Sequence, residues 1–395
     1  MPTSPKCSNC GGERLALLGP ASEVSTTTDG QVIPHRWSKS ECGACGMVES
    51  LLPDLAGLSG FSYQDTYRFY DRAAMAAFEA PRYGMYASVV ARLIGEVSAT
   101  RVLELGAGAG WVLERLAALC PGVAVRGLEP SSAMAEAAGA AGVRMIAGQL
   151  PNAELARWRP DFIYSVNVIE HVADCGQFLS AAAEILADHG HLLVICPNGQ
   201  VVDPELLFVD HLRTMEPQHL LAFAQRAGLQ LERWWPLEPA FGPFQAMLLR
   251  RAGDHAGAAP GADPFPRPEG LSARRRDFLE RWSRLDSILL ERLGGAGRVL
   301  GFGAGETADL LAAYAPRTWA RVAQLCVDRP SAAAAPGVAA CAGRRVGFLD
   351  ELDPAGWDAV LLTLKPRHHA GAAPRLTGKF DRVVRWDDVL PEPFP

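Results

Sequence analysis

The sequence contains no run of apolar residues that approaches the ~20 needed to span a bilayer. Residues 1–6, MPTSPK, lack the apolar core of a secretory signal. Basic residues are not in excess, because 38 Lys and Arg stand against 44 Asp and Glu, for a net charge of −6. Such a charge gives no electrostatic reason to bind a nucleic-acid backbone. We expect a cytoplasmic protein without a membrane or nucleic-acid partner.

The length of 395 residues exceeds twice that of a typical ~150-residue domain, so two or three domains are expected. With 49% hydrophobic and 21% charged residues, the chain can bury substantial cores and is globular. Residues 254–270 are rich in Ala, Gly and Pro and indicate an interdomain linker. The predicted organisation is an N-terminal module at 1–58, a central domain at 59–253, this linker, and a C-terminal domain at 271–395.

Cysteine is unevenly distributed, and four of the nine lie near the N-terminus. A disulfide framework is not expected in a cytoplasmic protein. Two CxxC turns bring two thiolates each to one centre, which predicts a tetrahedral structural zinc site with every position filled by protein. A β-hairpin through Val32 to Trp37 would separate the turns. Four free thiols and a redox pair remain alternatives. The predicted ligands are Cys7, Cys10, Cys42 and Cys45.

The central segment alternates strand-like and helical patterns. Such a rhythm predicts a doubly wound, parallel α/β sheet. The expected strands are 101–105, 123–128, 162–166 and 191–195, with helices at 111–119 and 176–187 between them. A helix at 217–227 and two edge strands, 230–235 and 245–249, follow.

The C-terminal region begins with a helix that we expect Ser272 to cap. Its apolar residues recur at helical spacing: Phe278, Trp282, Leu285, Leu289 and Leu293. Strand patterns at 298–302, 322–327 and 359–364 predict a second, smaller α/β unit. Nearer the N-terminus, Tyr70 and Tyr83 are candidates for an aromatic rim at the mouth of a binding site.

A glycine-rich turn follows the first strand of the central domain. Glycines at 106, 108 and 110 let the backbone approach a ligand, and Glu129 at the end of the next strand suits the two hydroxyls of a ribose. Two details favour S-adenosylmethionine (SAM) over a dinucleotide. The loop reads GxGxG, and Glu104 precedes it, where a carboxylate would attract a sulfonium and repel a pyrophosphate.

Three segments resemble successive motifs of the class I SAM-dependent methyltransferases: ELGAGAG at 104–110, GLEPSS at 127–132 and NVIEHV at 167–172. This resemblance implies a Rossmann-like domain that uses SAM. It also implies that Glu129 binds the ribose, that Gly106 and Gly108 lie under the methionine moiety, and that Gln149 borders the adenine. Glu104 and Asn167 are the remaining expected cofactor contacts.

The chain combines a four-Cys N-terminal module, the central domain and a C-terminal strand that runs into GFGAGE at 301–306. This architecture resembles the nucleotide-sugar C-methyltransferases, which act on dTDP-linked 4-keto-deoxysugars. The resemblance implies that His211 is the catalytic base, and that Asn167 precedes an active-site His171. Asp210 would either orient His211 or cap the following helix, and His171 would either contact substrate or form the pocket wall. Two residues depart from the family pattern, since Asp210 replaces a Glu and Phe208 replaces a Tyr.

The C-terminal unit carries a second glycine loop, 301–306, with Asp328 at the end of the next strand. By the same resemblance this unit encloses the sugar nucleotide and holds no second cofactor. Arg367 and His368 follow a strand of this unit. They are candidates to reach a diphosphate, or else ordinary solvated residues.

Methylation of carbon explains the need for a base, because a C–H bond next to a ketone must lose its proton first. A histidine with an ordinary pKa near 6.5 is largely neutral at pH 7 and able to accept that proton. Two alternatives stay open. One is O-, N- or C-methylation of another small natural-product metabolite, and the other is a zinc-ribbon adaptor protein whose α/β units bind NAD or have lost catalysis. Either a monomer or a homodimer is expected.

Overall fold

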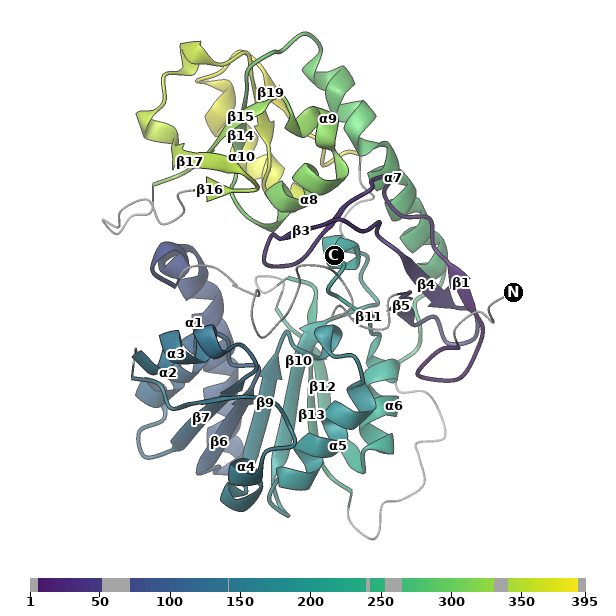
Figure 1. Cartoon of the computed structure of the whole chain (residues 1–395), viewed down its shortest axis with the longest axis vertical. Helices are drawn as coiled ribbons and strands as arrows, with labels where there is room; N and C mark the ends of the chain where they lie inside the picture. Colours follow the sequence, from purple (N-terminus) through teal and green to yellow (C-terminus); the bar gives the residue numbers. More distant parts are fainter. Residues whose placement is uncertain are drawn as a thin grey trace.

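The computed structural model describes residues 6–51, 72–140, 142–238, 242–252, 265–329 and 340–389, with the side chains of 72–81 left out. Three regions follow one another along the chain (Figure 1). An N-terminal β region lies beside the long helix α7 (Leu271–Leu293), the central α/β domain lies below it, and the C-terminal α/β domain lies above. Within the described residues, no helix is both long enough and apolar enough to cross a membrane.

The central domain is built on a seven-stranded sheet in the order β12-β13-β10-β9-β6-β7-β8. Its neighbours pair in parallel except where β13 runs against β10 and β12. The strands are β6 (Arg101–Leu105), β7 (Ala124–Glu129), β8 (Met145–Ala147), β9 (Phe162–Val166), β10 (His191–Pro197), β12 (Leu229–Pro236) and β13 (Phe244–Arg251). The predicted doubly wound sheet is confirmed, and all the strands expected here are present.

Helices cover both faces of this sheet, because each face carries its own apolar cluster. On one face, Leu103 and Ile163 pack with residues of α4 (Ala153–Trp158), α5 (Cys175–Ile185) and α6 (Pro217–Arg226). On the other, Val102 and Tyr164 pack with α1 (Arg72–Val97) and α2 (Trp111–Leu119). Helix α3 (Ser132–Ala140) follows β7. Consecutive strand residues therefore serve opposite layers, as a sheet buried on both faces requires.

The N-terminal region has two small sheets. The larger has four strands in the order β1-β4-β5-β11, namely β1 (Arg14–Ala16), β4 (Lys39–Cys42), β5 (Val48–Ser50) and β11 (Arg213–Thr214). Since β11 comes from the central domain, the two regions share this sheet. The hairpin begins earlier than the expected range of 32–37, because it is formed by β2 (Ser25–Thr26) and β3 (Val32–Ile33). Trp37 is instead buried in an apolar cluster.

The C-terminal domain has a six-stranded sheet in the order β16-β17-β15-β14-β18-β19, and only β16 pairs antiparallel. Its strands are β14 (Val299–Phe302), β15 (Val322–Val327), β16 (Ala340–Cys341), β17 (Arg344–Phe348), β18 (Ala359–Leu362) and β19 (Val383–Val384). Its helices are α8 (Glu306–Tyr314), α9 (Pro316–Trp319) and α10 (His369–Thr377). This confirms a second, smaller α/β unit.

Helix α7 buries all five apolar residues that its spacing predicts. Its N-cap is Gly270, and Ser272 lies inside the helix, so the predicted cap is wrong. The Ser272 hydroxyl instead donates to Glu41 at 2.9 Å. Of the predicted linker, residues 254–264 lie outside the described part, whereas Phe265 is buried against Trp234 and Arg267 pairs with Glu41.

Candidate active site

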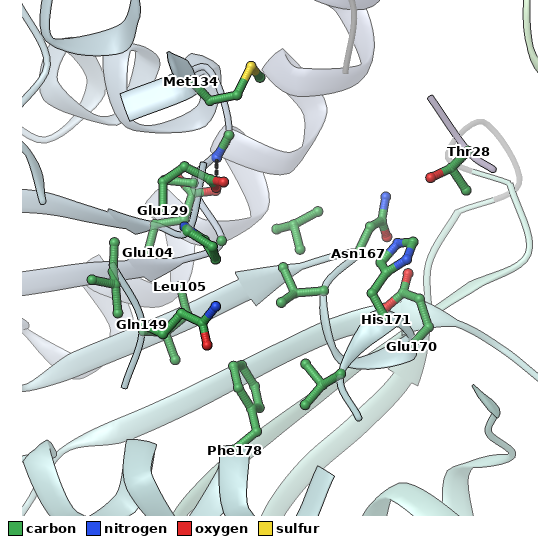
Figure 2. Close-up of a pocket in the computed structure, with 18 of the residues that line it drawn as sticks. Thr28, Glu104, Leu105, Glu129, Met134, Gln149, Asn167, Glu170, His171 and Phe178 are labelled. Carbon is green, nitrogen blue, oxygen red and sulfur yellow. Dashed lines mark hydrogen bonds between the residues drawn. The ribbon is translucent and has the colours of Figure 1, made fainter. Parts of the chain in front are cut away.

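A cavity of about 740 Å³ lies at the carboxyl ends of β6, β7 and β9. Ligands bind at this edge of open α/β sheets, where the strand order reverses. Most of the lining comes from the central domain, but Thr28 of the N-terminal region and Glu306 of the C-terminal domain complete the wall. All three regions thus enclose one space. Figure 2 shows Glu104 and Glu129 on one side of this cavity and Thr28 and His171 on the other.

The turn after β6 has a backbone that favours glycine. Gly106 has φ of 70°, and a Cβ there would lie 2.5 Å from Cγ2 of Val168. Gly108 has φ of 52°, and its N–H donates to Glu129 at 2.8 Å. Both residues line the cavity. The loop thus offers bare backbone to a ligand, as the sequence predicts.

The Glu129 carboxylate, at the end of β7, sits beside this turn (Figure 2). Its oxygens accept backbone N–H groups of Gly108 and Ser131 at 2.8 and 2.9 Å. Burial raises the pKa of Glu129, and these two bonds oppose that shift. Each oxygen keeps further acceptor capacity toward the cavity. The side chain is therefore fixed in advance to accept hydrogen bonds from a diol.

The neighbouring carboxylate Glu104 is more deeply buried and accepts the Tyr164 hydroxyl at 2.9 Å. Burial raises its pKa well above the usual value, and the like charge of Glu129 adds to the shift. A cation in the cavity would offset this cost by supplying the missing opposite charge. The pair is therefore suited to a ligand with a positive centre.

Asn167, directly after β9, has a left-handed backbone with φ of 54°. Its side-chain oxygen is buried and has no hydrogen-bond partner among the described residues. Gln149, after β8, lines the same side of the cavity (Figure 2). Both amides are placed to bind a polar ligand. The six predicted cofactor residues thus gather around one cleft, and the residues present fit SAM.

The two histidines expected at the active site are neighbours at the other end of the cavity. The rings of His171 and His211 lie 4.7 Å apart in an edge-to-face contact. Burial lowers the pKa of His171 to about 4 and that of His211 well below its usual value. Both imidazoles are thus neutral at pH 7, as proton acceptors need to be. Phe208 packs on His211 at 5.5 Å.

The carboxylate of Asp210 is directed elsewhere than expected. It accepts the backbone N–H of Thr28 at 3.0 Å and the Thr28 hydroxyl at 2.6 Å, and lies 3.5 Å from Nδ1 of His171. The next helix, α6, begins only at Pro217. Neither expected role is therefore observed, because Asp210 joins the N-terminal hairpin to the site loop and does not reach His211 or a helix end.

The four N-terminal cysteines form one cluster. Cys7 and Cys45 have their sulfur atoms 3.7 Å apart, and Cys10 and Cys42 have theirs 3.5 Å apart. All four sulfurs lie within 4.8 Å of one another. Tetrahedral zinc with Zn–S bonds of ~2.3 Å requires sulfur separations of about 3.8 Å. The donor set therefore fits zinc in both number and spacing.

Among the other candidates, Tyr83 lines the cavity and packs on Trp111 at 4.6 Å, whereas Tyr70 lies outside the described residues. The second glycine loop faces the same cavity through Glu306. Arg367 and His368 do not belong to the described lining, so a role for them in binding diphosphate stays a prediction.

Residues 71–257 match a family described as a methyltransferase domain. This match identifies a methyltransferase domain in that part of the chain. Over 142 residues the chain is 32% identical to a ubiquinone biosynthesis O-methyltransferase of Azorhizobium caulinodans, a match that covers 33% of this chain and 55% of the relative. The chain thus spans about half the length of that relative.

Two solved structures are also similar to the chain. One is a SAM-dependent methyltransferase of Clostridium acetobutylicum, 12% identical, covering 45% of this chain and 96% of the other, with a TM-score of 0.38. The other is a magnesium protoporphyrin IX methyltransferase of Synechocystis with bound S-adenosylhomocysteine, 15% identical, covering 44% and 84%, with a TM-score of 0.35.

Several charged residues around the site of the methyltransferase domain were not predicted from the sequence. Glu170 is 2% exposed, and neither carboxylate oxygen has a described hydrogen-bond partner. Glu205 lies 3.6 Å from Nδ1 of His211. Lys39 comes from the N-terminal β4, and burial lowers its pKa to about 7. Of these residues, only Glu170 belongs to a recognisable sequence motif, the Glu-His pair at 170–171. Glu205 and Lys39 reach the site through tertiary packing.

Proposed function

We propose that the protein is a SAM-dependent methyltransferase that methylates the carbon next to the ketone of a nucleotide-linked deoxysugar. The observation that carries this proposal is that the cofactor cleft and two neutral histidines share one cavity. Carbon methylation needs a proton acceptor beside the methyl donor, and this arrangement supplies one. Enclosure by three regions suits an acceptor larger than a single ring.

The residues of the cleft are suited to hold the cofactor. Glu129 would accept the ribose hydroxyls, and Gly106 and Gly108 would hold the methionine moiety through their backbone. Gln149 and Asn167 would bind polar groups of the cofactor. Glu104 would face the positive sulfonium, because a buried carboxylate is costly to ionise without a cation nearby. When bound, SAM supplies an electrophilic methyl group on a sulfonium.

His211 acts as the base in this proposal. Its Nδ1 faces Glu205, which leaves Nε2 as the nitrogen that accepts the proton. Removal of the proton from the acceptor carbon leaves an electron pair shared with the ketone oxygen. That pair would form the new C–C bond to the methyl group, while the sulfur–methyl bond would break and leave its electrons on the sulfur of S-adenosylhomocysteine. The buried imidazole is neutral beforehand, so no prior deprotonation is required.

The surrounding regions position the acceptor and exclude water. Thr28 is tied to Asp210, and Glu306 is tied to Lys365 at 2.8 Å, so both walls are fixed by hydrogen-bonded contacts. Arg82 also lines the cavity and lies 3.8 Å from Glu306, which places positive charge on the cavity wall for an anionic nucleotide. Fixed walls favour a defined orientation between acceptor and methyl donor.

Methylation of oxygen is a second candidate, because the curated relative carries the name of an O-methyltransferase. The same His211 would then accept a hydroxyl proton. The experiment that separates the candidates is incubation of the protein with SAM and a dTDP-4-keto-deoxysugar. A gain of one methyl with a carbon-bound chemical shift supports the first candidate, and a heteroatom-bound methyl supports the second. No gain with this acceptor counts against the sugar assignment.

We also propose that Cys7, Cys10, Cys42 and Cys45 bind a structural zinc ion. The support is their mutual spacing. Four thiolates fill every position of a tetrahedral zinc ion, as they do in structural zinc sites. Since Cys42 ends β4, the ion would hold the sheet that β11 joins to the methyltransferase domain. Its role would be to fix the wall that carries Thr28.

A further inference from the structure

The histidine that serves as base in the proposed function has a carboxylate neighbour other than the adjacent Asp210. Glu205 lies in the 3₁₀ turn Pro204–Leu207, and its Oε2 is 3.6 Å from Nδ1 of His211. That turn is held in place by Asp203, which caps it by accepting the N–H of Glu205 at 3.1 Å. Glu205 also lines the cavity. It is therefore held beside the imidazole by its own local structure.

A lysine of the C-terminal domain approaches the same carboxylate. Nζ of Lys365 lies 3.8 Å from Oε1 of Glu205 and 2.8 Å from Oε2 of Glu306. Glu306 in turn lies 3.8 Å from Arg82 on α1. A line of alternating charges therefore runs from His211 across the interface between the two α/β domains.

We propose that Glu205 is the positioning residue of His211, and that Lys365 of the C-terminal domain sets its charge. This inference rests on the proposed function only in calling His211 the base. When Glu205 is ionised, its charge 3.6 Å from Nδ1 stabilises the imidazolium that forms when Nε2 of His211 takes a proton. When the C-terminal domain packs on the central domain, it brings Lys365 next to Glu205 and so favours the ionised carboxylate beside His211.

The charges around the pair set the pH at which Glu205 becomes ionised, and a pKa above 7 leaves most of this carboxyl protonated at neutral pH. Burial raises the pKa of Glu205 to about 8, while Lys365 opposes the rise and Glu306 and Asp203 add to it. Burial is the largest cause that lowers the pKa of His211; His171, Lys39 and Lys365 also disfavour its charged form, whereas a hydrogen bond to the backbone of Glu205 favours it. Lys365 and Arg82 both favour an ionised Glu205, and the effect of Lys365 is the larger, so removal of Lys365 would leave the carboxyl protonated to a higher pH.

The test compares ring-nitrogen NMR signals of histidine-labelled protein, assigned with His211→Asn and His171→Asn. We expect Glu205→Gln to move the Nδ1 signal of His211 and leave that of His171 nearly unchanged. Asp210→Asn should leave the His211 signal nearly unchanged, because the Asp210 carboxylate is bonded to Thr28 and its backbone carbonyl, which the substitution keeps, bonds Nδ1 of His171 at 2.9 Å. Movement of His211 by Asp210→Asn with no movement by Glu205→Gln would overturn the proposal.

The role of the C-terminal domain is tested in the same spectra with Lys365→Met. It should move the His211 signal, whereas the matched variant Lys379→Met, at an exposed position of the same domain, should not. Equal spectra for the two lysine variants would remove Lys365 from the assignment. These signals need no substrate, so their outcome is independent of whether methyl transfer to the sugar nucleotide is observed.

In turnover assays, substitutions of Glu205 and Lys365 should change kcat and leave KM nearly unchanged. Glu205→Gln should lower kcat roughly 10- to 100-fold with little change in KM, because it acts on the charged state of the base. Lys365→Met should move the rising limb of the kcat profile to higher pH. A fall in apparent affinity alone, with an unchanged profile, would assign both residues to substrate binding.

Discussion

The guanidinium of Arg275 on α7 donates to the carboxylate of Glu41 on β4 at a distance of 2.7 Å. The same group bonds Glu216 of the methyltransferase domain at 3.0 Å, and it is 1% exposed. One side chain thus joins all three regions that enclose the cavity. Because the cavity walls come from different regions, this joint fixes the relative placement of the cofactor cleft, Thr28 and Glu306.

Substitution of Arg275 should lower the free energy of unfolding of the protein. Arg275→Met leaves Glu41 and Glu216 as buried carboxylates with one cation fewer, which costs about 3–5 kcal/mol in the free energy of unfolding. Arg276→Met is the matched control, since Arg276 is 61% exposed and 3.8 Å from Glu41. It should change the free energy by less than about 0.5 kcal/mol. Similar denaturant midpoints for the two variants would contradict the role of the joint.

Removal of the metal should loosen the N-terminal region. A structural zinc site contributes folding energy directly, so chelation should lower Tm, and the purified protein should contain about one zinc per chain. Cys42→Ser should lose both the metal and the added stability. Cys120→Ser, outside the cluster, should keep both. Protein that folds fully without stoichiometric metal would refute the site.

The cofactor cleft is tested by the affinity for S-adenosylhomocysteine. Glu129→Ala removes the charged acceptor expected for the ribose, which costs about 1.5–3 kcal/mol, or roughly 10- to 150-fold in Kd. Glu136→Ala, an exposed position on α3, should bind like the unmodified protein. Calorimetry with NAD should give no binding. Tight NAD binding without S-adenosylhomocysteine binding would favour an adaptor or dinucleotide protein.

Asp309 on α8 makes stability depend on pH. Burial raises its pKa to about 7, and the like charges of Glu306 and Asp29 add to the shift, while Cys341 donates to it. The folded-state pKa lies above the ordinary value of 3.8, so the folded state favours the protonated form. The stabilisation is present below pH ~4 and is lost as the pH rises through about 7.

Asp309→Asn mimics the protonated side chain and should remove this part of the pH dependence. Its Tm should match that of the unmodified protein near pH 4 and exceed it near pH 8. The difference between the two proteins is the measurement, because other titrating groups cancel. A constant difference over this range would show that Asp309 does not titrate between these limits.

The central sheet was predictable because its strands are short apolar runs between turns, and β6, β9 and α2 have the predicted bounds. The glycine loop was predictable because its positive φ values demand glycine. The partner of His211 was not predictable. Adjacency favoured Asp210, whereas the loop turns that side chain toward Thr28, more than 180 residues earlier in the chain. Contacts of that range depend on how the regions dock, which no local pattern encodes.

The most direct test of the proposed chemistry is proton exchange without methyl transfer. With S-adenosylhomocysteine and a dTDP-4-keto-deoxysugar in D₂O, the protein should place deuterium on the carbon next to the ketone. His211→Asn should abolish this exchange while still binding S-adenosylhomocysteine with unchanged affinity. Exchange by the variant at the rate of the unmodified protein would contradict the assignment of His211 as the base.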